Sequence, residues 1–67
     1  MAKYIIKDVT YPGLLIYVQA ITPSVIYTSN RLEDAKRYEK AQVVSDFLRL
    51  KNEIPENKYS IQIVRQK

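Results

Sequence analysis

The chain lacks histidine, cysteine and tryptophan altogether, and it has a single glycine, Gly13. Histidine moves protons near neutral pH, cysteine supplies thiolate nucleophiles and zinc ligands, and glycine-rich loops bind phosphate. These absences argue against histidine-dependent nucleophilic triads, thiolate metal sites and glycine-rich nucleotide loops. We therefore expect no enzymatic activity, no catalytic residues, no cofactor and no metal site.

The absence of cysteine also removes the disulfides that stabilise many small domains. A chain of 67 residues makes one domain, residues 1–67, which buries only about 60% of the surface its unfolded form exposes. Its hydrophobic content of 46% is too high for a disordered protein. Oligomerisation is the remaining common route to more buried area, so we expect a homodimer.

Long apolar runs are missing as well. The longest, Leu14 to Val18, is far shorter than the roughly 20 residues that span a bilayer. The start, Met1 to Tyr4, lacks the apolar core of a secretory signal. The sequence thus predicts a cytoplasmic protein with no membrane association.

The positive charge lies toward the two ends of the chain. Residues 31–56 carry six basic and six acidic side chains, whereas residues 1–30 sum to +1 and residues 57–67 to +3, which gives the net +4. If the first and last strands are neighbours, four basic residues would form one patch able to contact nucleic-acid phosphates. These are Lys3, Lys7, Arg65 and Lys67. A solubilising rim is the more common role of such residues.

The first half of the chain predicts three strands in a meander. Residues 3–9 and 14–21 are rich in β-branched and aromatic side chains, and 25–28 form a shorter run of the same kind. Between the first two, Tyr11-Pro12-Gly13-Leu14 predicts a type II turn, because proline presets φ at its second position and glycine accepts the positive φ of its third.

The middle of the chain changes to helical spacing. Asn30 and Glu33 fit a capping box. The apolar residues that follow fit two faces better than one, so we expect a short helical turn, a bend near Tyr38–Lys40, and then the main helix. One unbroken helix over residues 31–53 is the alternative. The apolar residues expected to pack the helix on the sheet are Val43, Val44, Phe47 and Leu48, with Phe47 at the centre.

The last element is an alternating strand over residues 59–64, after Pro55 ends the helix. The predicted fold class is α+β: one small sheet in the order β-β-β-α-β along the chain, antiparallel or mixed, with one main amphipathic helix on one face. The order of the strands within the sheet stays open.

Several stretches together resemble a type of small uncharacterised protein encoded by phages and mobile elements of Gram-positive bacteria. They are Tyr4-Ile5-Ile6-Lys7, Tyr27-Thr28, Asp34-Ala35-Lys36-Arg37-Tyr38 and Tyr59-Ser60-Ile61. The resemblance covers nearly the whole chain, and its motifs are structural. It implies an accessory protein acting on a host or phage macromolecule in the host cytoplasm, with no catalytic residues to carry over.

Clusters that could carry chemistry have simpler explanations. Glu33 and Asp34 are adjacent and suit the positive end of a helix. Ser45 and Ser60 have no histidine to act as a base. Lys36, Arg37 and Lys40 alternate with acidic residues at helical spacing, as on a solvated, salt-bridged face.

The second strand is apolar on both of its faces. Leu14, Ile16 and Val18 alternate with Leu15, Tyr17 and, further on, Ile21. A strand of this kind usually has both faces covered, and one helix covers only one face of the sheet. We therefore predict that Leu15, Tyr17 and Ile21 form an interface.

These observations favour a small non-enzymatic interaction protein that binds a protein partner, a second copy or a host or phage protein, through the apolar strand face. The alternative is a weak nucleic-acid-binding protein. It would use the basic terminal strands and exposed tyrosines, since aromatic side chains on an open sheet can stack on bases.

Overall fold

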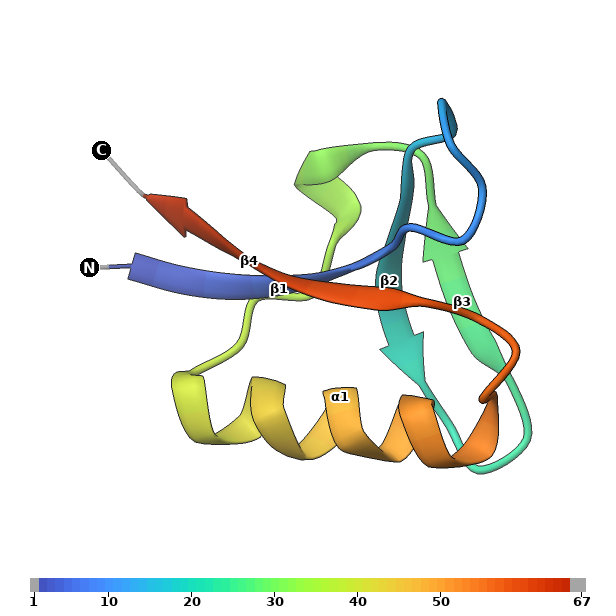
Figure 1. Cartoon of the computed structure of the whole chain (residues 1–67). Coiled ribbons are helices and arrows are strands. Elements are labelled where there is room, and N and C mark those ends of the chain that lie inside the picture. The colour runs from blue at the N-terminus through green and yellow to red at the C-terminus, as the bar shows by residue number, and fades with distance from the viewer. Residues whose placement is uncertain (1, 66–67) are drawn as a thin grey trace.

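The computed structural model describes residues 2–65 and confirms the α+β class (Figure 1). Along the chain come β1 (Ala2–Asp8), β2 (Ile16–Ile21), β3 (Ile26–Ser29), the 3₁₀ turn η1 (Leu32–Asp34), α1 (Lys40–Glu53) and β4 (Tyr59–Arg65). The strands form one sheet in the order β3-β2-β1-β4, with every neighbouring pair antiparallel. The three-strand meander is therefore present, and the closing strand lies beside the first.

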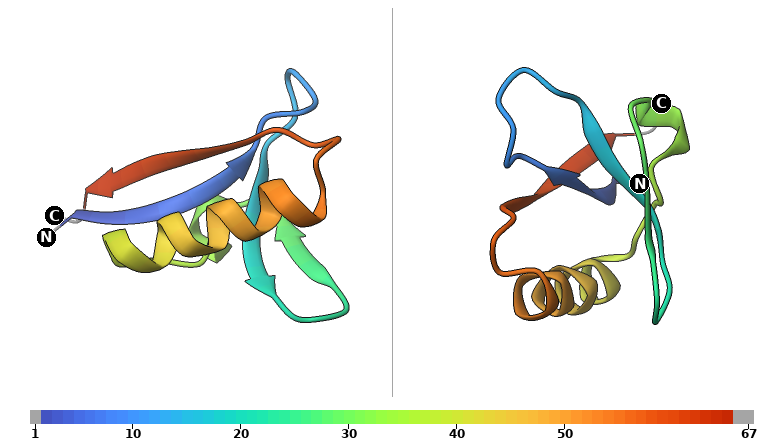
Figure 2. Two further views of the ribbon diagram at one scale, coloured as in Figure 1. Left: turned by 60° about the horizontal axis from the view of Figure 1, so that its bottom comes forward. Right: turned by 90° about the vertical axis from the view of Figure 1, so that its right-hand side faces the viewer.

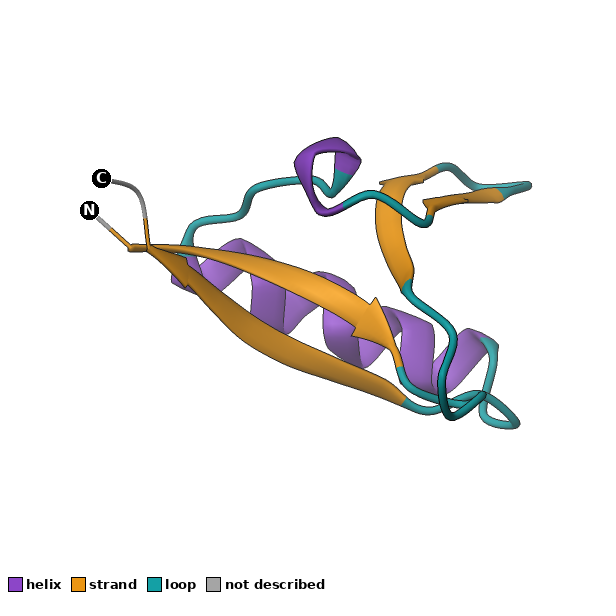
Figure 3. Ribbon diagram, turned by 90° about the horizontal axis from the view of Figure 1, so that it is seen from above, coloured by secondary structure: helices purple, strands orange, loops and turns teal. Residues whose placement is uncertain are grey.

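The sheet consists of two ribbons that share a short seam. β1 pairs with β4 from Ala2↔Arg65 to Asp8↔Tyr59, but with β2 only at Lys7↔Tyr17 and Asp8↔Ile16. Beyond that seam the β2–β3 hairpin turns away from the β1–β4 ribbon (Figure 3). Helix α1 lies in the angle between the two ribbons (Figure 2).

The main core fills that angle. Its buried residues come from both ribbons, from the linker before α1 and from α1 itself: Ile6, Val18, Tyr38, Val43 and Leu50. Phe47 and Ile61 are among the partly buried side chains packed against them. A second, smaller cluster on the opposite face of the sheet contains Ile5, Tyr17 and Ala35. The chain thus covers part of the face that the helix does not reach.

The helical region is bent as expected: η1 ends at Asp34, and α1 begins at Lys40. The face of α1 differs from the expectation. Val43 is buried and Phe47 packs on the core, but Val44 and Leu48 are 43% and 53% exposed, whereas Leu50 is fully buried. The linker fixes where α1 starts. As a result Val43, Phe47 and Leu50, spaced i, i+4, i+7, face the sheet, whereas Val44 and Leu48 lie on a different side of the helix.

The two predicted local motifs have opposite outcomes. The Tyr11–Leu14 turn is present: the Leu14 amide donates to the Tyr11 carbonyl at 3.2 Å, and Gly13 has φ of +85°. The capping box at Asn30 and Glu33 is wrong. Arg31 occupies the N-cap of η1 with no side-chain cap bond, and Glu33 instead binds Arg31.

Candidate functional site

The predicted interface residues do not share one face. Leu15 precedes β2 and is 54% exposed, whereas Tyr17 is only 9% exposed and packs with Ile5 and Ala35. Ile21 packs on the opposite, helix-facing core. The cause is a bulge between Val18 and Ala20, which shifts the β2–β3 register and reverses the alternation that the sequence pattern assumes. Dimerisation through these residues stays a prediction. The uncovered apolar face from which it was predicted is not present.

The basic residues of the terminal strands are neighbours in part. β1 and β4 pair directly: Lys3 lies opposite Val64, next to Arg65, but Lys7 lies opposite Ser60, near the start of β4. Lys3 forms an ion pair with Glu39, and the Lys7 ammonium lies 5.9 Å from the centre of the Tyr17 ring. Arg65 is placed by its backbone alone, and Lys67 lies outside the described residues.

The tyrosines do not form an exposed platform. Tyr4 and Tyr59 pack against the main core, and Tyr17 and Tyr38 are buried. Only Tyr11 and Tyr27 are exposed, at 53% and 52%, and they lie on different elements. Contact with nucleic-acid bases would therefore fall on isolated rings.

The linker from η1 to α1 closes the outer edge of β1. Tyr38 and Tyr4 exchange backbone hydrogen bonds of 2.8 and 3.0 Å, and the Lys36 amide donates to the Val18 carbonyl at 3.1 Å. The linker thereby joins the diverging ribbons at the point where β1 and β2 no longer pair.

One buried hydroxyl fixes this linker to α1. The Tyr38 hydroxyl donates to a carboxylate oxygen of Asp46 at 2.8 Å. Burial raises the pKa of Tyr38 well above its usual range, and the hydrogen bond and negative charge of Asp46 raise it further. The hydroxyl therefore stays protonated, as a structural donor requires.

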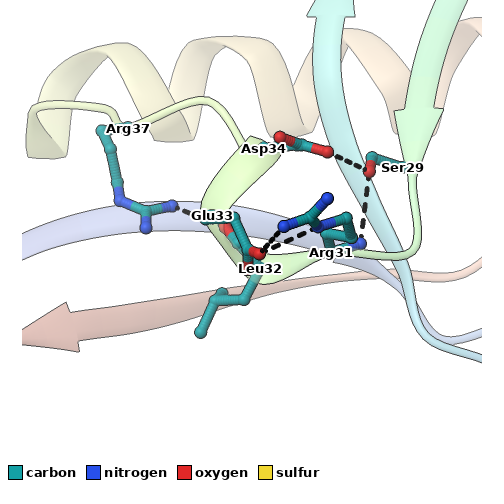
Figure 4. Close-up of polar contacts among 6 residues, drawn as sticks. All are labelled: Ser29, Arg31, Leu32, Glu33, Asp34 and Arg37. Carbon is teal, nitrogen blue, oxygen red and sulfur yellow. Dashed lines mark hydrogen bonds and ion pairs between the residues drawn. The ribbon is translucent and has the colours of Figure 1, made fainter.

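The charged residues around η1 bind one another (Figure 4). Ser29 donates to Asp34 at 2.8 Å, Arg31 pairs with Glu33 at 2.6 Å, and Arg37 donates to two backbone carbonyls. The pKa of the Glu33 carboxyl is lowered by a hydrogen bond from the backbone amide of Glu33 and by the side chain of Arg31. All of these groups have partners within the turn, so their arrangement accounts for the conformation of η1.

The opposite edge of the β1–β4 ribbon is open. β4 is the last strand of the sheet, and no described element pairs with its outer side. The Val9 amide donates to the Lys58 carbonyl, so alternate residues onward, such as Ser60 and Gln62, direct their backbone groups toward β1. The intervening residues direct theirs outward: Tyr59, Ile61, Ile63 and Arg65. These backbone groups can accept a further strand.

An apolar strip of α1 lies beside this edge. Lys40, Val44, Phe47 and Lys51 share one helical stripe by their i, i+4, i+7, i+11 spacing. The other flank of α1 carries Asp46, which accepts a hydrogen bond from Tyr38 of the linker, so this stripe faces the β4 side. Ile63 pairs with Tyr4 and therefore projects on the helix-facing side of β4, where it remains 56% exposed.

We call the exposed or partly buried apolar side chains at this place the β4–α1 surface. It comprises Val44, Leu48, Ile61 and Ile63. The sequence predicted the strand and the amphipathic helix, but it gave the strand no position in the sheet. One signal was available: residues 59–64 contain no proline and no charged side chain, the residues that usually protect an edge.

No helix among residues 2–65 is long and apolar enough to cross a membrane. In the same range, no three side chains of metal-binding type are grouped to hold an ion. Comparisons with protein-family models, with curated proteins and with solved structures give no match to this chain.

Proposed function

We propose that this chain is a non-enzymatic protein-binding domain and that its partner adds an extended segment to the free edge of β4. The observation that carries the proposal is the combination at the β4–α1 surface. Unpaired backbone groups run along a seven-residue strand, and exposed apolar side chains of α1 and β4 lie beside them. Strand addition uses these two features together: backbone bonds supply affinity, and flanking side chains supply specificity.

Two other exposed regions support binding less well. β3 also lies at an edge of the sheet, but it has only four residues. The loop between β1 and β2 exposes Tyr11, Leu14 and Leu15, each by more than half. Its backbone forms a closed turn and offers no row of unpaired groups, so β4 is the better candidate.

The source of the segment follows from the resemblance to phage and mobile-element proteins, which favours a host or phage protein in the cytoplasm. Nucleic-acid binding remains the alternative. Lys3 is already paired with Glu39, and the exposed tyrosines are apart. The β4 edge therefore supports a protein partner better.

The test uses a display library of random peptides, selected on the intact chain, followed by the variant Ile63→Pro. The Ile63 amide points outward, so proline removes an edge donor and places its ring at the edge without breaking the bonds to β1. We expect the selected peptides to bind Ile63→Pro at least about tenfold more weakly than wild type. The readout is the dissociation constant from fluorescence anisotropy.

Ile63→Val is the matched control, because it keeps the amide and a β-branched side chain, and it should bind like the wild type. Cooperative thermal unfolding of Ile63→Pro establishes that the variant is folded. Selection of no binding peptide, or equal binding to folded Ile63→Pro, would contradict the proposal.

A further inference from the structure

The lysines around the β4–α1 surface have no acidic partners. In the described part of the chain, the ion pairs join Lys3 to Glu39, Arg31 to Glu33 and Arg49 to Glu53. Five other described lysines take part in none of them. Lys7 and Lys36 lie elsewhere in the fold, and the remaining three border the β4–α1 surface. They are Lys40, Lys51 and Lys58.

Each of these lysines has a defined place. Lys40 and Lys51 lie at the two ends of the helical stripe that contains Val44. Lys58 immediately precedes β4, and its alternation with Ser60 places it on the sheet face opposite α1. Because α1 and β4 run in opposite directions (Figure 1), Lys51 lies near the start of β4 and Lys40 near its end. Lysines therefore lie near both ends of the apolar strip.

We propose that the added segment alternates apolar and acidic residues, a proposal that rests on the function proposed above. Its apolar side chains face α1 and cover Val44, Leu48 and Ile63. Its acidic side chains occupy the intervening positions, on the face of Lys58, and also the first and last positions on the α1 face, where they meet Lys40 and Lys51. Alternate residues of a strand point to opposite faces, so one short segment satisfies both requirements.

A second copy of this chain is a poorer occupant. Two β4 strands meeting edge to edge would place the two α1 helices on the same face of the joined sheet, with their lysine-bearing flanks toward each other. Lys40 and Lys51 would then face the like charges of the other copy, which disfavours the contact. An acidic segment converts the same lysines into attractive contacts.

The first test compares three synthetic peptides of the length of β4. In each, the third and fifth residues are valine and face α1, and all other positions, both ends included, hold glutamate, glutamine or lysine. We expect the glutamate peptide to bind about tenfold or more tightly than the glutamine peptide, with the lysine peptide weakest, since each exposed ion pair contributes roughly a two- to fivefold factor. The advantage of glutamate should shrink as salt is raised.

The second test assigns the effect to particular lysines. The double variant Lys51→Glu and Lys58→Glu should lose the preference for the glutamate peptide and favour the lysine peptide. Lys36→Glu is the control, because Lys36 is exposed on the linker beyond β1, far from the β4 edge in the sheet. Lys36→Glu should keep most of the wild-type preference for glutamate.

The outcomes separate the two proposals. Peptides that bind with equal affinity whatever their charge, and that lose binding to Ile63→Pro, would overturn the acidic preference and leave strand addition intact. Failure of every peptide to bind would overturn both. A dimer in sedimentation that Ile63→Pro dissociates would also overturn the acidic segment, in favour of a second copy.

Discussion

The β1–β4 ribbon has two edges, and the chain finishes them in different ways. At the β1 edge, the linker before α1 exchanges backbone bonds with Tyr4, and it also bonds Val18 of the neighbouring β2. At the β4 edge, the backbone groups of Tyr59, Ile61 and Ile63 have no neighbouring strand. The same ribbon is thus closed on one side and open on the other.

The closed side also holds the residues that the rest of the fold requires. Tyr38 is buried and binds Asp46, and Ala35 joins Ile5 and Tyr17 in the second cluster. On the open side, the apolar side chains of Val44, Leu48 and Ile63 are exposed. The hydroxyl bond and the second cluster thus lie on the closed side, whereas the exposed apolar side chains lie on the open side.

The largest expected effect compares two leucines of α1. Leu50 is fully buried and Leu48 is 53% exposed. Leu50→Ala should lower the free energy of unfolding by about 2–5 kcal/mol, because it leaves a cavity in the main core. Leu48→Ala should change it by no more than about 0.5 kcal/mol. Urea denaturation measures both, and similar values would mean that the face assigned to α1 is wrong.

A second comparison uses two tyrosines on paired strands. Tyr17→Lys should destabilise the fold by about 2–3 kcal/mol, because it places a charge in the cluster with Ile5 and Ala35. Tyr27→Lys, at a site 52% exposed, should have little effect. Thermal unfolding distinguishes them. A fully stable Tyr17→Lys would show that the closed side does not depend on this cluster.

A smaller effect is expected at the hydroxyl that fixes the linker. Tyr38→Phe keeps the ring and removes the bond to Asp46, which should cost about 1 kcal/mol near neutral pH.

The effect of Tyr38→Phe should also depend on pH. The pKa of Tyr38 is raised in the folded state by burial and by Asp46. The stabilisation is therefore fully present below the unfolded pKa of about 10 and is lost as pH rises above it. The stability difference between wild type and Tyr38→Phe should shrink in that range. A difference that stays constant from neutral to alkaline pH would contradict the assigned role of this hydroxyl.

Much of the fold was predictable because its signals are local. The Pro12-Gly13 turn, the alternating last strand and the bend before α1 each depend on neighbouring residues, and the structure contains all three. The face of β2 was not predictable, because the bulge after Val18 depends on how β3 pairs with it. The candidate site was missed for a related reason: the position of β4 at the edge is a property of the whole sheet.

Amide hydrogen exchange along β4, followed by NMR in the free chain and with the alternating valine–glutamate peptide, tests the account most directly. In the free chain, the Ser60, Gln62 and Val64 amides should be protected by β1, and those of Tyr59, Ile61 and Ile63 should exchange rapidly. Saturating peptide should slow the exchange of the second set and leave the first set protected. Uniform protection in the free chain, or no slowing at Ile61 and Ile63 under conditions where the peptide is bound, would contradict an open β4 edge that accepts a strand.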